Sequence, residues 1–213
     1  MKTIPIANRE FIILMTIALL LSACAEPQPQ NIDNACDIFS EKKAWYDAAI
    51  SSQERWNIPV EVTLAFIHQE SSFRANAKPP RGKLLGFIPW FGRVSSASGY
   101  AQALDASWSE YKKETGRWYA RRSNFKHSAD FIGWYNDKSA RTLNLSRNDA
   151  YSLYLAYHEG RDGFKRKTYN QKPWLLKVAN KVKQRTADYR RQLASCAVQP
   201  RSWLSRWMHF DFL

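Results

Sequence analysis

Residues 57–73 read NIPVEVTLAFIHQESSF, and this stretch decides the fold. Asn57 has the side chain of a helix N-cap, and Pro59 suits a first turn, where its missing N–H is not needed. Apolar residues recur on two adjoining faces of the helix that follows. The stretch therefore predicts a helix that is buried on most sides.

One carboxylate lies near the end of this predicted helix. Glu70 follows Phe66 and Ile67 by one turn, so its carboxyl group would lie against apolar surface. Desolvation there would raise its pKa, which a general acid working near neutral pH requires. The pattern alone also fits a solvated glutamate at a helix edge, which is the commoner situation.

Three short segments carry a resemblance to a known family. IHQESSF at 67–73, with Ala77 following, resembles the Glu-Ser motif of the lytic transglycosylases of the soluble-transglycosylase, goose-type-lysozyme-like superfamily. GYAQ at 99–102 resembles the Gly-Leu-Met-Gln segment of that family, and AYHEG at 156–160 resembles its Ala-Tyr-Asn-Ala-Gly segment. The three segments occur in the family's order across about half the chain.

The resemblance implies a mainly α fold, a lysozyme-like helical domain with at most a small β element. It also implies cleavage of the MurNAc–GlcNAc β-1,4 linkage of peptidoglycan with formation of 1,6-anhydroMurNAc, without a cofactor. Glu70 would be the catalytic acid, and Ser71, Gln102 and Tyr157 would position the acid and the sugar. Gln102 equally fits a turn with a solvated side chain, and Tyr157 a core tyrosine with a satisfied hydroxyl.

The second and third segments depart from the family pattern. Residues 103–105 replace the family's Ile-Met-Pro, and His158 and Glu159 replace its usual Asn-Ala. We expect Glu159 to be a structural or substrate-contacting residue. Two other functions stay open, namely a goose-lysozyme-type hydrolase and a non-catalytic peptidoglycan-binding lipoprotein. The hydrolase would need a base opposite Glu70, for which the candidates are Asp105, Asp130 and Glu159.

The beginning of the chain has the pattern of a lipoprotein signal peptide, residues 1–23. A basic start precedes an apolar run at 11–21 that is too short to span a bilayer comfortably. LSAC at 21–24 matches a bacterial lipobox, which predicts cleavage before Cys24 and lipid attachment to it. Ala25 then favours the outer membrane, with the domain on the periplasmic face. An ordinary secretory peptide with an incidental cysteine is the alternative.

The mature chain is expected to contain one domain between two short segments. Residues 24–35, rich in Pro and Gln, read as a flexible tether, and 36–197 as the lysozyme-like domain. In an oxidising periplasm a disulfide between Cys36 and Cys196 is the economical interpretation, with two free thiols as the alternative. The aromatic and basic tail at 198–213 fits an interfacial helix, a segment folded back on the domain or a disordered end.

The formal net charge of +13 suits a polyanionic partner such as peptidoglycan, or a membrane surface. Nucleic acid is not expected, because the basic residues are spread along the chain without a recognised motif. No metal site is expected either, since the four histidines show no ligand spacing (His68, His127, His158 and His209).

Residues 75–98 break the helical pattern with several prolines and glycines, yet 84–91 is strongly apolar. Such a loop can cover an edge of the core, form a lid or wall of the substrate groove, or contact a bilayer.

Overall fold

The structure is a computed structural model that describes residues 26–79, 81–84, 88–93 and 95–196. The predicted signal peptide, with Cys24, and the tail at 198–213 lie outside the described residues. Seven α-helices form the described body: α2 (Ala35–Glu41), α3 (Lys43–Trp56), α4 (Val60–Ser71), α5 (Asp105–Thr115), α6 (Phe125–Leu143), α7 (Ala150–Lys165) and α8 (Pro173–Ser195). A short 3-10 helix, η1 (Thr168–Gln171), links α7 to α8. The predicted mainly α fold is confirmed.

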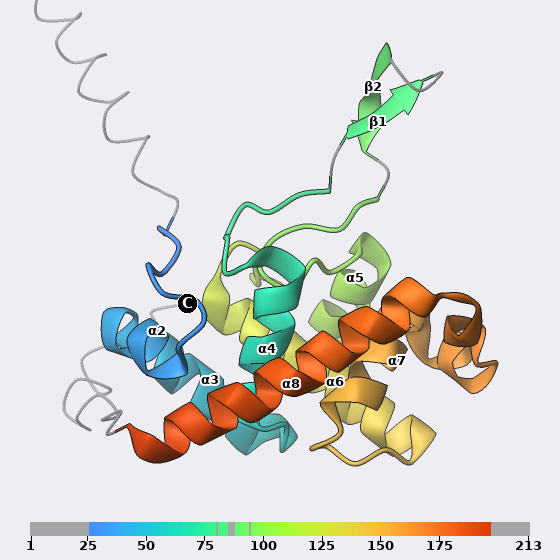
Figure 1. The fold of residues 1–213 in the computed structure, drawn as a ribbon. Coiled ribbons are helices and arrows are strands. Elements are labelled where there is room, and N and C mark those ends of the chain that lie inside the picture. Colours follow the sequence, from blue (N-terminus) through green and yellow to red (C-terminus); the bar gives the residue numbers. More distant parts are fainter. Residues whose placement is uncertain (1–25, 80, 85–87, 94, 197–213) are drawn as a thin grey trace, which may run out of the picture.

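Helix α4 is the centre of the packing. It contacts α3, α6 and α8, while α7 packs against α6 and α8 (Figure 1). Every residue from Val62 to Ile67 is buried, so α4 has apolar neighbours on nearly all sides. This burial confirms the prediction drawn from the apolar pattern of residues 57–73, and it brings Glu70 to the end of a rigid central helix.

The beginning of α4 differs from the sequence-based expectation. Asn57 is not its N-cap but ends α3 in a left-handed conformation, with φ 56° and its N–H donated to Gln53 O at 2.7 Å. Asparagine is one of the few residues that tolerate this conformation well. The first N–H of α4, that of Val60, is bound instead by the Gln53 side chain at 2.9 Å.

The segment between α4 and α5 contains the β element. Strands β1 (Arg81–Leu84) and β2 (Ile88–Arg93) pair antiparallel, with Leu84 opposite Ile88. In Figure 1 this hairpin projects away from the helices. The small β element that was expected is therefore a hairpin inserted between the first two motifs. The choice among a core cover, a lid and a bilayer contact stays open, because residues 85–87 lie outside the described part.

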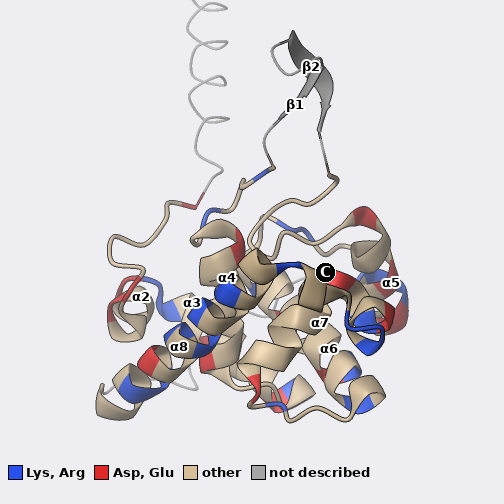
Figure 2. Cartoon of the chain, turned by 45° about the vertical axis from the view of Figure 1, so that its right-hand side comes forward, with Lys and Arg blue, Asp and Glu red and all other residues tan. Residues whose placement is uncertain are grey.

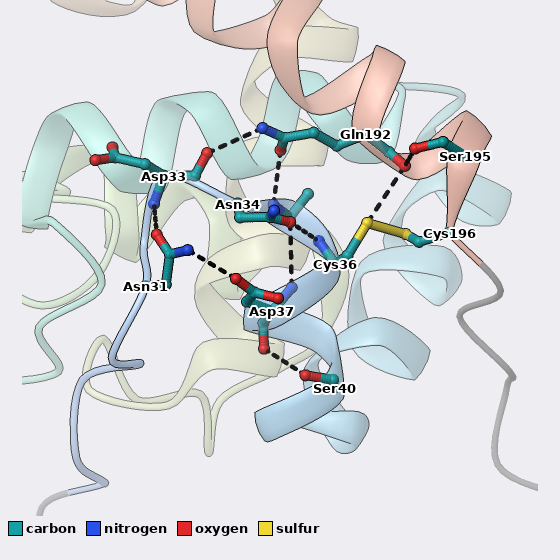
Figure 3. The surroundings of a disulfide bond; sticks show 10 residues. Asn31, Asp33, Asn34, Cys36, Asp37, Ser40, Gln192, Ser195 and Cys196 are labelled. Carbon is teal, nitrogen blue, oxygen red and sulfur yellow. Dashed lines mark hydrogen bonds between the residues drawn. A yellow bond between two sulfur atoms is a disulfide. The ribbon is translucent and has the colours of Figure 1, made fainter.

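A disulfide joins the two ends of the described domain. Cys36 and Cys196 are bonded across 160 positions of sequence, with their Cα atoms 6.0 Å apart. Beside it, Gln192 accepts a hydrogen bond from Ala35 N at 2.8 Å and donates one to Asp33 O at 3.1 Å (Figure 3). The predicted pairing is thus present, and losing such a link typically costs about 2–5 kcal/mol of stability.

Residues 26–34 differ from the flexible tether expected for 24–35, because their side chains contact the helical body. The Glu26 carboxylate accepts a hydrogen bond from Trp45 Nε1 at 3.0 Å, and Gln28 Nε2 donates to Ser72 O at 2.6 Å. Pro29 is buried as well. These contacts hold the segment against the domain.

Charged residues of both signs lie on the described surface (Figure 2). In Figure 2, Lys and Arg are spread over several elements, α8 among them, with Asp and Glu between them. Within the described ranges, no helix combines the length and the apolar character needed to span a membrane.

Candidate active site

Glu70 lies in the last turn of α4, and its side chain is partly buried. Burial raises the pKa of its carboxyl group from 4.5 to about 7, although a hydrogen bond with Tyr154 acts in the opposite direction. The phenol is the donor, since its own pKa is raised by burial and by the charge of Glu70. Near neutral pH a large fraction of Glu70 is therefore protonated.

Two tyrosine side chains lie near this carboxyl group. Tyr154 and Tyr157 lie one turn apart in α7, and both pack edge-on against Phe66 of α4, with ring centroids 5.3 and 5.4 Å away. The pKa of Tyr157 is raised well above its usual range, first by burial and then by the charge of Glu70. Both phenols thus remain neutral donors beside the carboxylate.

Tyr157 also connects the third motif to the second. Its hydroxyl donates a hydrogen bond of 2.5 Å to Ala101 O, and its ring packs against Tyr135 at 5.0 Å. The hydroxyl is therefore already engaged by protein, and the side chain holds residues 99–102 against α7. The positioning of the acid by Tyr157 stays a prediction.

Gln102 joins the two ends of the hairpin insertion. Its side-chain Nε2 donates to Ala77 O at 2.9 Å and to Gly99 O at 2.8 Å, so only the Oε1 acceptor is left for a ligand. The turn depends on Gly99, which has φ 75° and donates its N–H to Ala77 O at 2.9 Å. A Cβ atom at Gly99 would meet Arg122 O at 2.1 Å, so no other residue fits.

Ser71 has its side chain inside the protein. The hydroxyl donates to Ile67 O at 3.0 Å in the same helix, and the Ser71 carbonyl accepts from Arg74 N and Nε. The residue therefore closes the end of α4 next to Glu70. A direct contact between Ser71 and substrate stays a prediction.

Glu159 lies in an environment opposite to that of Glu70. Its side chain is only 4% exposed and forms an ion pair with Lys172 at 2.7 Å, while Thr168 and His158 Nδ1 also hydrogen-bond its carboxylate. Burial alone would raise the pKa of Glu159, but the hydrogen bonds from these three groups outweigh it and lower that pKa to about 2. Glu159 is thus ionised and fully engaged.

A cavity of about 240 Å³ lies where the second and third motifs meet. Its walls come from the start of α5, the middle of α6 and the end of the regular part of α7, where Gly160 interrupts the helix with φ 72° and ψ 161°. The lining residues are Gln102, Ala103, Leu104, Ser107, Phe131, Tyr135, Tyr157, His158, Glu159 and Gly160. Three predicted site residues, Gln102, Tyr157 and Glu159, thus come together here.

The other two candidate bases are also held in ion pairs. Asp105 is bonded to Arg122 at 2.7 Å on the surface. Asp130 is nearly buried, and its carboxylate is contacted by Tyr111, Trp56, Arg117 and Arg55. The Asp130 carboxylate is therefore enclosed by its partners, whereas Asp105 is 72% exposed beside Arg122.

Sequence reasoning missed two contacts of the candidate site. Tyr154, the hydrogen-bond partner of Glu70, stands three residues before the motif tyrosine, and that spacing places both on one face of α7. Lys172, the ion-pair partner of Glu159, follows the Gly160 interruption and η1, so no helical spacing pointed to it. No group of three or more His, Cys, Asp or Glu side chains that could hold a metal ion occurs in the described part of the chain.

A family model described as "Transglycosylase SLT domain" matches residues 12–196. No curated protein and no solved structure matches the chain. The family match covers all three motifs and most of the described fold, with Glu70, Tyr157 and Gln102 in the arrangement given above. The chain therefore belongs to the transglycosylase SLT domain family.

Proposed function

We propose that the protein is a lytic transglycosylase that cleaves the MurNAc–GlcNAc β-1,4 linkage of peptidoglycan and leaves 1,6-anhydroMurNAc ends. The observation that carries this proposal is the single carboxyl group of Glu70, whose pKa of about 7 lets it serve as an acid and then as a base at neutral pH. The family match supports a peptidoglycan substrate.

The proposed reaction uses one proton carrier. Glu70 protonates the glycosidic oxygen as the C1–O bond breaks, and positive charge develops on the MurNAc ring as an oxocarbenium-like species. The resulting carboxylate then removes the proton from the MurNAc C6 hydroxyl, whose oxygen bonds to C1. The GlcNAc hydroxyl leaves as the neutral product, and Glu70 ends protonated as it began.

Tyr154 and Tyr157 support both roles of Glu70. The Tyr154 hydroxyl stabilises the carboxylate that exists between the two proton transfers, while the aromatic surroundings destabilise it enough to keep the pKa near neutrality. Tyr157 fixes the neighbouring 99–102 turn through Ala101 O, and Gln102 offers one acceptor to the sugar.

The engaged state of the other carboxylates favours this mechanism over hydrolysis. An inverting hydrolase needs a second carboxylate that is free to activate water on the far side of the sugar. Asp105, Asp130 and Glu159 all form ion pairs within the protein instead. An intramolecular nucleophile, the C6 hydroxyl, needs no such base.

The proposed location is the periplasmic face of the outer membrane, with a lipid on Cys24 as the anchor. The support for it is the lipobox at 21–24. Because residues 26–34 contact the helical body, such an anchor would hold the domain close to the bilayer.

The test is mass spectrometry of purified peptidoglycan digested by the mature domain, beside Glu70→Gln. Products with 1,6-anhydroMurNAc ends, absent with the variant, are expected. Glu61→Gln makes the same change in the same helix, where Glu61 pairs with Arg190, and should leave the digestion unchanged. Reducing MurNAc ends would instead show a hydrolase, and binding without cleavage would show a recognition protein.

A further inference from the structure

The His158–Glu159 pair, which stands where the family has Asn-Ala, builds a rigid feature beside the cavity. The Glu159 carboxylate accepts from Lys172 Nζ at 2.7 Å and from Thr168 Oγ1, and it lies 3.0 Å from His158 Nδ1. Thr168 is also bonded to Gly163 O at 3.2 Å. The elements on both sides of the Gly160 interruption thereby hold one imidazole ring in a fixed orientation.

The orientation decides which chemical group His158 presents. An ionised carboxylate can only accept hydrogen bonds, so the Nδ1 atom facing Glu159 carries a hydrogen. In the neutral ring the other nitrogen, Nε2, is then a bare acceptor. The side chain is 37% exposed and lines the cavity, so this acceptor is available to a ligand.

Gln102 presents the same kind of group on the other side of the cavity. Both hydrogens of its Nε2 are donated to Ala77 O and Gly99 O, so its Oε1 is the atom left for a ligand. The Tyr157 hydroxyl likewise donates its hydrogen to Ala101 O, so its oxygen is left as an acceptor. These three residues therefore offer acceptors, which match the hydroxyl groups of a sugar and not the carboxylates of a peptide stem.

Trp174 adds an exposed aromatic surface next to His158. It stands in the first turn of α8, packs edge-on against the imidazole with ring centroids 5.1 Å apart, and remains 53% exposed. A large aromatic ring with half of its surface exposed can cover the C–H face of a pyranose ring. The exposed Leu104, 49% accessible, extends the apolar rim of the same cavity.

We propose that His158 and Trp174 form a glycan subsite that binds an N-acetylated hexosamine ring through its hydroxyl groups and its apolar face, with Glu159 as the positioning residue for His158. The subsite rests on the proposed function, because that function makes the cavity lined by Tyr157 and His158 the place where the glycan strand binds. Its ligand is the sugar backbone and not the peptide, so recognition at this point is independent of how the peptide stems are cross-linked.

The test is calorimetric titration of the Glu70→Gln full chain, which cannot cleave, with the peptide-free tetrasaccharide of N-acetylglucosamine. We expect binding that weakens about tenfold on adding His158→Ala and about tenfold on adding Trp174→Ala. Trp118→Ala removes another exposed tryptophan, 76% accessible, which packs against Tyr119 and not against His158, and should leave the affinity unchanged. Melting temperatures check that each variant is folded.

Glu159→Gln separates positioning from simple packing. The amide can donate to Nδ1, which moves the imidazole hydrogen to Nε2 and removes the acceptor. We expect weaker tetrasaccharide binding and an altered ¹⁵N shift of His158 Nε2, while the unaltered chain shows a change at that nitrogen on adding the sugar. Unchanged affinity in His158→Ala and Trp174→Ala, or no response at Nε2, would overturn the subsite.

The two proposals can fail separately. If the unaltered chain gives anhydro products and His158→Ala and Trp174→Ala bind the sugar as tightly as before, the subsite proposal is wrong and the transglycosylase proposal stands. Binding that depends on His158 and Trp174, with no cleavage by the unaltered chain, would keep the subsite and remove the proposed reaction.

Discussion

Glu70 lies near Tyr157, and Glu159 lines the cavity that Tyr157 also lines, yet the surroundings of the two glutamates drive their pKa values in opposite directions. Glu70 has aromatic neighbours and a hydrogen bond from Tyr154, so burial dominates and its pKa rises to about 7. Burial also acts on Glu159, but Lys172, Thr168 and His158 reverse its effect and the pKa falls to about 2. The number of donors, rather than burial alone, separates a glutamate with a pKa near 7 from one that is held ionised.

The two residues consequently affect stability over different pH ranges and with opposite signs. The native state holds the Glu70 proton more tightly than the unfolded chain does. The contribution of Glu70 to the free energy of unfolding therefore falls as the pH rises from about 4.5 to about 7. Glu159 is held ionised, so its contribution is present above about 4.5 and is lost as the pH falls toward 2.

The largest expected effect comes from removing the ionisable group of Glu70. The variant Glu70→Gln should raise the free energy of unfolding at pH 8 by about 2–3 kcal/mol, because an ionised carboxylate no longer has to be buried. The gain should vanish at pH 4, where the wild-type group is protonated in both states. Chemical denaturation at the two pH values measures it, with Glu61→Gln as the control, and a gain of equal size at both would contradict the assigned pKa.

A second expected effect concerns the rate of cleavage. Glu70 must be protonated to act as an acid, so the rate should fall about 50-fold between pH 7 and pH 9, following the loss of the protonated form. Soluble muropeptide release, followed across this range, would show it. Glu159→Gln should lower the rate at every pH without changing the pH at which the alkaline fall of the pH–rate profile occurs. A change in that pH would reverse the roles assigned to the two residues.

A third expected effect comes from removing the cation that pairs with Glu159. Lys172→Met removes the cation from a carboxylate that is 4% exposed, but the lysine itself is 40% exposed, so the loss is expected to be only about 1–2 kcal/mol of unfolding free energy. Adding Glu159→Gln should recover most of it, since the unpaired charge is then gone. Lys177→Met, on the exposed side of α8, provides the matched control. A double variant as unstable as the single one would show that the ion pair is not the cause.

The smallest expected effect tests the hydrogen bond from Tyr154 to Glu70. That bond stabilises the carboxylate, so Tyr154→Phe should raise the pKa of Glu70 and move the alkaline limb upward by about one pH unit or less. Tyr151→Phe makes the same change in the same helix and should leave the limb in place. A downward shift in Tyr154→Phe would mean that the phenol destabilises the ionised form.

Much of this arrangement could be predicted from the sequence, because it depends on local spacing. The buried helix α4 follows from the apolar pattern of one segment, while the raised pKa of Glu70 and the Cys36–Cys196 link were each one of two interpretations that the sequence allowed. The helix beginning was misassigned at Asn57, because the same side chain serves an N-cap and a left-handed helix end.

The partners of the two glutamates could not be predicted in the same way. Tyr151, Tyr154 and Tyr157 are all on α7, and only the packing of α7 against α4 selects Tyr154 for Glu70. The contact between Lys172 and Glu159 lies beyond the backbone turn at Gly160. The periodic pattern of the sequence does not predict the φ of 72° at that residue. Long-range pairing, and not local propensity, decides these contacts.

The bond between Cys36 and Cys196 also has a mechanical consequence. A pull applied between the segment before Cys36 and the segment after Cys196 would be carried across two Cα atoms that are 6.0 Å apart, and not through the helices between them. Helix α4 would then receive load only through the contacts of residues 26–34, such as that of Gln28 with Ser72 O. With the proposed function, such a domain could be fastened at either end of a stretched cell-wall network while α5, α6 and α7 lie outside the path of the tension.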